Sequence, residues 1–96
     1  MKGTEKQIKW AEDIIAKARE TLDRNIALID RVDTIGARKD ERQCYVDCRE
    51  SLEKMLEGVD DAAKIIDMRE RLSSSSILQM VENECIRRNN HKYGKR

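Results

Sequence analysis

Apolar side chains recur at alternating spacings of three and four residues in two long runs of this sequence. Such spacing lines them along one side of an α-helix and is typical of helices that pack lengthwise against another helix. The first seam, in which Asn25 is the polar member, is Ile8, Ala11, Ile15, Ala18, Leu22, Asn25, Ile29 and Val32. The second seam is Tyr45, Cys48, Leu52, Met55, Val59, Ala62 and Ile66.

The first seam predicts a helix over about residues 5–33. Thr4 and Gln7 form a capping box at its start, because each side chain can bond the backbone N–H of the other residue. The chain contains no proline, so no helix has to end for lack of a backbone N–H. The register breaks over residues 33–39, where Gly36 can end a helix.

The second seam predicts a helix over about residues 40–72. Its phase passes Gly58 without a shift, so we expect one continuous helix. The alternative is two helices joined at residues 58–60. Two long helices connected by a short loop are expected to pack antiparallel.

A short serine linker, residues 73–76, precedes a third helix that we expect over about residues 77–88. Ser76 and Gln79 predict a second capping box. The main apolar stripe of this helix is Leu78, Val81 and Cys85. The predicted fold is therefore all-α: an elongated antiparallel helical hairpin (about 5–33 and 40–72) with a shorter third helix (about 77–88), in a single helical domain spanning residues 1–96.

Charged residues make up 41% of the chain, yet the net charge is only +1. Self-repulsion therefore does not favour disorder, and no apolar run of about 18 residues is present to cross a membrane. The first residues are polar and lead into no apolar segment, so we expect no signal peptide and a cytoplasmic protein. With one histidine and no grouping of nucleophile and base, we predict that the chain is not an enzyme and has no cofactor.

The predicted second helix is rich in carboxylates, and five of them are candidates for binding a partner protein. These are Glu50, Glu53, Glu57, Asp60 and Asp61. Carboxylates on a helix face complement a basic surface on another protein. The alternative is an ordinary solvated face, because basic residues are interleaved through the same stretch.

The last eleven residues, 86–96, contain five basic side chains and no acidic one. We expect a basic tail over about residues 89–96, and Arg87 and Arg88 just before it are candidates for contacting nucleic acid or an acidic protein face. The alternative is that these charges only favour the C-terminal end of a helix. The rest of the chain is not basic, which disfavours a dedicated DNA-binding fold.

Three cysteines and one histidine, Cys44, Cys48, Cys85 and His91, leave two interpretations open. They have the ligand types of a Cys3His zinc set, but their spacing is not that of a zinc knuckle. We expect reduced, buried thiols instead. Trp10 either packs against the end of a neighbouring helix or serves as an exposed contact for a partner. The narrow seams fit a monomeric hairpin or a homodimer.

The segment Gly3–Ile14, GTEKQIKWAEDI, resembles the opening TGSEKQIxWAExI of small proteins encoded by phages and mobile elements of Gram-positive bacteria. About twelve residues match closely, and the rest matches only in layout. In those proteins a Ser/Ala stretch leads into a Trp-Trp-Ile-like sequence, whereas here Ser73–Ser76 lead into Ile77 and Leu78 without a tryptophan. Any role of that aromatic pair is therefore not carried over.

The resemblance implies an accessory protein of a prophage or mobile element. From it we expect an inhibitor of host defence, of the anti-CRISPR type, that binds a Cas effector or nuclease and blocks nucleic-acid access or cleavage. The alternative is a nucleic-acid-associated accessory or regulatory protein that uses the basic C-terminal arm.

Overall fold

The computed structural model describes the backbone of residues 1–93 and the side chains of residues 1–89. Four α-helices make up this part of the chain: α1 (Glu5–Val32), α2 (Lys39–Glu57), α3 (Ala62–Asp67) and α4 (Ser74–Tyr93). Residues 1–93 contain no strand, so the predicted all-α fold is confirmed. None of these four helices is long and apolar enough to span a bilayer.

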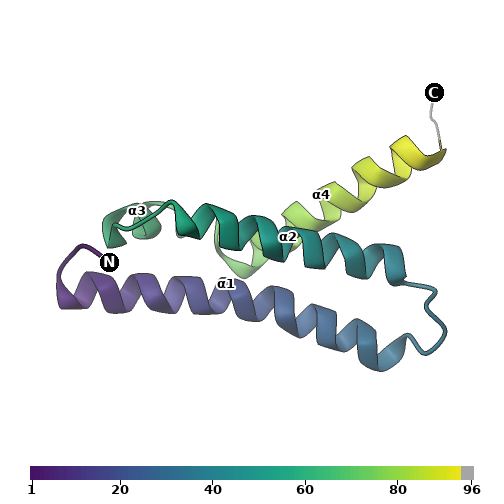
Figure 1. The fold of residues 1–96 in the computed structure, drawn as a ribbon, viewed down its shortest axis with the longest axis horizontal. Helices are drawn as coiled ribbons and strands as arrows, with labels where there is room; N and C mark the ends of the chain where they lie inside the picture. Colours follow the sequence, from purple (N-terminus) through teal and green to yellow (C-terminus); the bar gives the residue numbers. More distant parts are fainter. Residues whose placement is uncertain (94–96) are drawn as a thin grey trace.

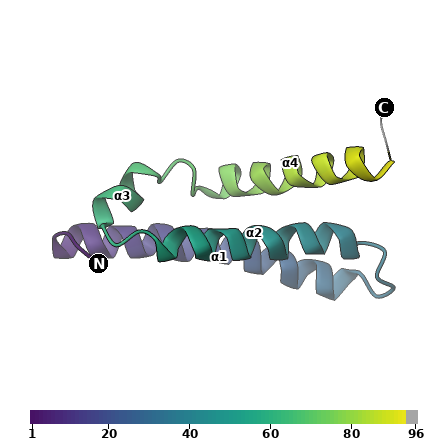
Figure 2. The ribbon, with the colours of Figure 1, turned by 45° about the horizontal axis from the view of Figure 1, so that its top comes forward.

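Helices α1 and α2 form the predicted antiparallel hairpin, and α4 runs back along it (Figure 1). Turning the molecule shows that α4 forms a second layer over the α1–α2 pair (Figure 2). The radius of gyration is 15.5 Å, whereas a compact chain of this length has a value of roughly 12.5 Å. The predicted elongated shape is therefore confirmed.

The capping box at the start of α1 is confirmed. The Thr4 hydroxyl accepts from the Gln7 backbone N–H at 3.1 Å, and the Gln7 side-chain oxygen accepts from the Thr4 N–H at 3.0 Å. The first seam faces the core, where Ala11, Ala18, Leu22 and Ile29 are buried. Val32, its last member, is 52% exposed because the seam reaches beyond the helices that cover it.

The prediction of one continuous second helix was wrong. Helix α2 ends at Glu57, and α3 begins after a turn over residues 58–61. The Asp61 side chain accepts from the Ala63 N–H at 3.0 Å and so starts α3. Backbone hydrogen bonds of 2.8 Å join Lys2 to Asp60 and to Ala62, so the N-terminal segment holds the turn in place.

The break also changes which isoleucine enters the core. The second seam predicts Ile66 as an inward position, but Ile66 is half-buried and its neighbour Ile65 is fully buried. The seam keeps its phase only up to Ala62, which is also fully buried. Because α3 is a separate helix with its own direction, its buried side does not follow the register of α2.

The predicted bounds of the third helix, residues 77–88, were too narrow at both ends. Helix α4 begins at Ser74, and the Ser73 hydroxyl accepts from the Ser76 N–H at 3.3 Å. Ser76 therefore lies inside the helix, and the predicted capping box with Gln79 does not form. The helix continues to Tyr93, so the predicted basic tail is helical over residues 89–93.

The apolar stripe of α4 also differs from the predicted one. Ile77 and Val81 are buried, and Cys85 is half-buried next to them. Leu78, which the sequence suggested as an inward residue, is 37% exposed. Residues four apart along α4 therefore face the hairpin, and Leu78 lies to one side of that contact.

Candidate functional site

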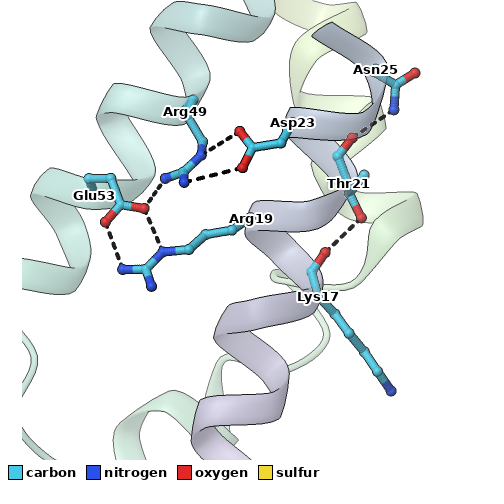
Figure 3. Close-up of polar contacts among 7 residues, drawn as sticks. All are labelled: Lys17, Arg19, Thr21, Asp23, Asn25, Arg49 and Glu53. Atoms are coloured by element: carbon cyan, nitrogen blue, oxygen red, sulfur yellow. Dashed lines mark hydrogen bonds and ion pairs between the residues drawn. The ribbon is translucent and has the colours of Figure 1, made fainter. Parts of the chain in front are cut away.

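Glu53, one of the predicted partner-binding residues, belongs to an ion-pair network between α1 and α2 (Figure 3). Its two carboxylate oxygens accept from the Arg19 guanidinium, both at 2.7 Å. Arg49 also pairs with Glu53, and it bonds Asp23 on α1 at 2.9 Å. Glu53 therefore already has two cationic partners within the chain, and the network fixes the register of the hairpin.

Hydrogen bonding from Arg19 lowers the pKa of Glu53 below its ordinary value. A carboxylate with a lowered pKa stabilises the fold at neutral pH, and this stabilisation is lost as the pH falls below about 4.5 towards the folded-state pKa. We expect Glu53→Gln to lower the free energy of unfolding at pH 7 by at most about 1 kcal/mol, because the network is partly exposed. The loss should be smaller at pH 3, as measured by urea unfolding at both pH values.

Glu57→Gln is the matched control for this prediction. Glu57 lies one turn further along α2, and it forms no ion pair with any residue that the structure describes. We expect its substitution to leave the pH dependence of stability unchanged. Equal responses of the two variants would contradict a stabilising role for the network.

Asp60 and Asp61, two further predicted residues, have structural partners. The Asp60 carboxylate lies 3.3 Å from the N-terminal ammonium of Met1, and Asp61 caps α3. Both carboxylates therefore hold the turn between α2 and α3. Their partners were hidden from sequence reasoning because the contact with Met1 depends on the N-terminal segment lying beside the turn.

Glu50 and Glu57 are the remaining members of the predicted acidic set. Both are exposed, and neither has an ion-pair or hydrogen-bond partner among the residues that the structure describes. Seven residues apart on α2, they face the same direction at a separation of about 10 Å along the helix. Together they form what we call the acidic edge of α2.

Arg87 and Arg88, the predicted basic candidates, both pair with Glu84 on their own helix. Arg88 also donates to Asp47 on α2 at 2.7 Å and so ties α4 to the hairpin. The bonds to Glu84 and Asp47 raise the pKa of Arg88. The pKa of Asp47 is lowered, mainly by a hydrogen bond from Gln43 and secondly by the bond from Arg88. Both arginines therefore have carboxylate partners within the chain, although the Arg87 side chain remains 70% exposed. The basic residues after position 89 lie outside the described side chains.

The cysteines lie between α2 and α4. Cys44 and Cys48 are buried, Cys85 is half-buried, and all three are free thiols. The pKa of Cys85 is raised to about 12, mainly by burial and secondly by a hydrogen bond with Cys44. Burial also raises the pKa of Cys48. Protonated thiols are poor nucleophiles and poor metal ligands. His91, the fourth residue of the considered zinc set, lies outside the described side chains, and the described residues contain no group of three metal-binding side chains.

Sequence reasoning missed an open groove of about 860 Å³ between the first half of α2 and the middle of α4. Apolar groups on its walls come from Cys44, Tyr45, Leu78, Val81 and Cys85. Charged residues of both signs also line the groove, namely Arg38, Asp40, Glu41, Glu82 and Arg88. The sequence contained one sign of this groove, namely Leu78. It is apolar and adjacent to Ile77, so Leu78 and Ile77 give α4 apolar residues on more than one side.

The side of α4 turned away from the hairpin carries few charges. Eight residues between positions 75 and 87 are exposed, and we call them the outer face of α4: Ser75, Leu78, Gln79, Met80, Glu82, Asn83, Ile86 and Arg87. Glu82 and Arg87 are the two charged residues of the eight. Depletion of charge with retention of apolar side chains is the composition found in the centre of protein interfaces.

Trp10 is half-exposed on α1, and the Arg69 guanidinium lies over its ring, 5.6 Å from the ring centre. Arg69 lies two residues after Asp67, the last residue of α3. Trp10 therefore contacts the end of a neighbouring helix through a cation–π interaction while keeping one side open to solvent.

Comparisons of the chain with models of protein families, with curated proteins and with solved structures gave no match.

Proposed function

We propose that this chain is a non-catalytic binding protein that inhibits a defence nuclease of its bacterial host, of the CRISPR effector type. The observation that carries this proposal is the acidic edge of α2, where Glu50 and Glu57 are exposed and have no partner in the described part of the chain. The resemblance of Gly3–Ile14 to phage and mobile-element proteins supports the choice of target class.

A binding role is favoured by the state of the other reactive groups. The thiols of Cys48 and Cys85 have raised pKa values, and the Glu53 carboxylate is held by two arginines. Groups in these states hold a structure together, whereas a nucleophile needs an adjacent base or a lowered pKa.

The acidic edge complements a basic surface. Two carboxylates on a helix that is fixed by the Arg19–Glu53–Arg49 network keep their separation before and after binding, so they lose little conformational freedom. A nuclease channel is lined with Lys and Arg side chains that bind the negative phosphates of nucleic acid. Carboxylates carry negative charge too and can pair with the same cations. The chain would therefore inhibit by occupying this channel, without chemistry of its own.

The experiment is affinity capture from lysate of a Gram-positive host, followed by a cleavage assay with the recovered effector. We expect a Cas nuclease in near-equal amount to the tagged chain, and inhibition of its cleavage of target nucleic acid. The double variant Glu50→Lys/Glu57→Lys should bind about tenfold to a hundredfold more weakly, since each tenfold corresponds to about 1.4 kcal/mol.

A matched control makes the same change in charge elsewhere. Glu12 and Glu70 are exposed carboxylates on other segments, without ion-pair partners among the described residues. Glu12→Lys/Glu70→Lys should bind the effector like the unaltered chain. If both double variants lost affinity equally, the loss would follow from the change in net charge and not from the acidic edge. Recovery of nucleic acid alone, lost at high salt and on truncation after Asn89, would overturn the inhibitor proposal in favour of the basic arm.

A further inference from the structure

Cys44 and Cys85 bring two thiols together from helices that are far apart in sequence. Cys44 lies on α2 and Cys85 on α4, and both side chains line the groove between these helices. The two thiols are also joined by a hydrogen bond. A disulfide needs Cβ atoms about 4 Å apart and an S–S distance of about 2 Å. Two sulfur atoms in hydrogen-bond contact can therefore reach this geometry by rotation of their side chains.

The packing around the two cysteines holds their helices side by side. Three residues further along each helix, Arg88 of α4 donates to Asp47 of α2 at 2.7 Å. One turn before Cys85, Val81 is buried in the core cluster that also contains Cys44. Cys85 itself packs against this cluster. Contacts on both sides of the two cysteines thus keep α4 next to α2 at the height where the thiols meet.

The three cysteines differ in their access to solvent. Cys85 is half-buried on the wall of an open groove, whereas Cys44 is only 2% exposed. Cys48, one turn along α2 from Cys44, is buried, and it is not among the described residues that line the groove. A reagent that enters the groove therefore meets Cys85 first, and Cys44 is the thiol in contact with it.

We propose that Cys44 and Cys85 form a reversible disulfide that fastens α4 to α2, with a low-molecular-weight disulfide such as oxidised glutathione as the oxidant. The Cys85 thiolate attacks one sulfur of the oxidant, so that a mixed disulfide forms and one glutathione thiolate leaves. The Cys44 thiolate then attacks the Cys85 sulfur, and the second glutathione thiolate leaves. Two electrons pass from the protein to the oxidant, and the two protein protons end on the two released thiols.

The cross-link forms slowly and has a large effect on stability. The raised pKa of Cys85 slows the first step at neutral pH, because the thiolate is the attacking species. The extent of oxidation at equilibrium depends instead on how well the fold accommodates the disulfide relative to the two thiols. The bond closes a loop of about 40 residues and should raise Tm by roughly 10 °C or more. This proposal does not depend on the proposed inhibitor function.

The test exposes the full chain to excess oxidised glutathione at about pH 8.5, where more thiolate is present than at neutral pH. The remaining thiols are blocked with N-ethylmaleimide, and the intact mass and a peptide map are recorded. We expect one blocked cysteine in place of the three free ones, and a peptide that joins Cys44 to Cys85. Tm, followed by circular dichroism, should rise on oxidation and return to the reduced value with dithiothreitol.

Cys48→Ala is the matched control, because it removes the third thiol and should leave the cross-link intact. Cys44→Ala should stop at the mixed disulfide between Cys85 and glutathione, without the gain in Tm. If this buried substitution unfolds the chain, Cys85→Ala makes the comparison at a half-buried site and should give no cross-link. A folded wild-type chain that keeps three free thiols, stops at the mixed disulfide or links Cys48 to another cysteine would overturn the proposal.

Discussion

Replacing Ile65 by alanine is expected to lower the free energy of unfolding by about 3 kcal/mol. Ile65 is fully buried in the six-residue helix α3 and belongs to the single core cluster, together with Leu22 and Ala62. Truncation removes three carbons from this site and leaves a cavity, because the short helix is held at both ends by turns. Small domains have a total stability of only about 5–15 kcal/mol, so the loss is a large share.

Ile66→Ala is the matched control. It is the same substitution one residue further along the chain, at a side chain that is only half-buried. We expect it to cost about 1 kcal/mol or less. Urea unfolding at one fixed protein concentration measures both variants. A larger loss for Ile66→Ala than for Ile65→Ala would contradict the break after Glu57, because only a continuous helix places Ile66 in the seam.

Replacing Ile77 by alanine is the second change with a large expected effect, again about 3 kcal/mol. Ile77 is 2% exposed, lies in the first turn of α4 and belongs to the core cluster. Its removal weakens the attachment of α4 to the hairpin, since Val81 is the only other fully inward apolar residue of the described part of that helix. In the Ile77→Ala variant, we expect the backbone amides of α4 to exchange their hydrogens faster than those of α1.

Leu78→Ala provides the comparison for Ile77. The Leu78 side chain is 37% exposed beside the groove, so its truncation should cost about 1 kcal/mol or less within one chain. Unfolding measurements on both variants would check the ranking. If Leu78→Ala were the more destabilising substitution at low protein concentration, the orientation of α4 would be contradicted.

The candidate site was only partly predictable. The sequence showed which residues are charged, but Glu53, Asp61 and Arg88 turned out to hold helices or turns together. A carboxylate on a helix pairs with whichever cation the neighbouring helix brings within reach, and this neighbour is set by the three-dimensional arrangement. Glu50 and Glu57 remained as candidates because no described residue of the opposite charge pairs with them.

The groove was not predictable for the same reason. It lies between residues about 40 positions apart, such as Tyr45 and Cys85, and its walls exist only once α4 lies over α2. Leu78 could be recognised as apolar, but its side of the helix could not, because both Ile77 and Leu78 fit a helical stripe with Val81.

The sequence by itself determined the helical class, the long first helix with its capping box, and the antiparallel hairpin. These features follow from the spacing of apolar residues and from side chains within three or four positions of each other, which are local properties of the chain. The tertiary structure decided the end of α2, the burial of Ile65 in place of Ile66, the partners of the charged residues and the groove beside α4. Each of these depends on contacts between segments far apart in sequence, such as Lys2 with Asp60 and Arg88 with Asp47.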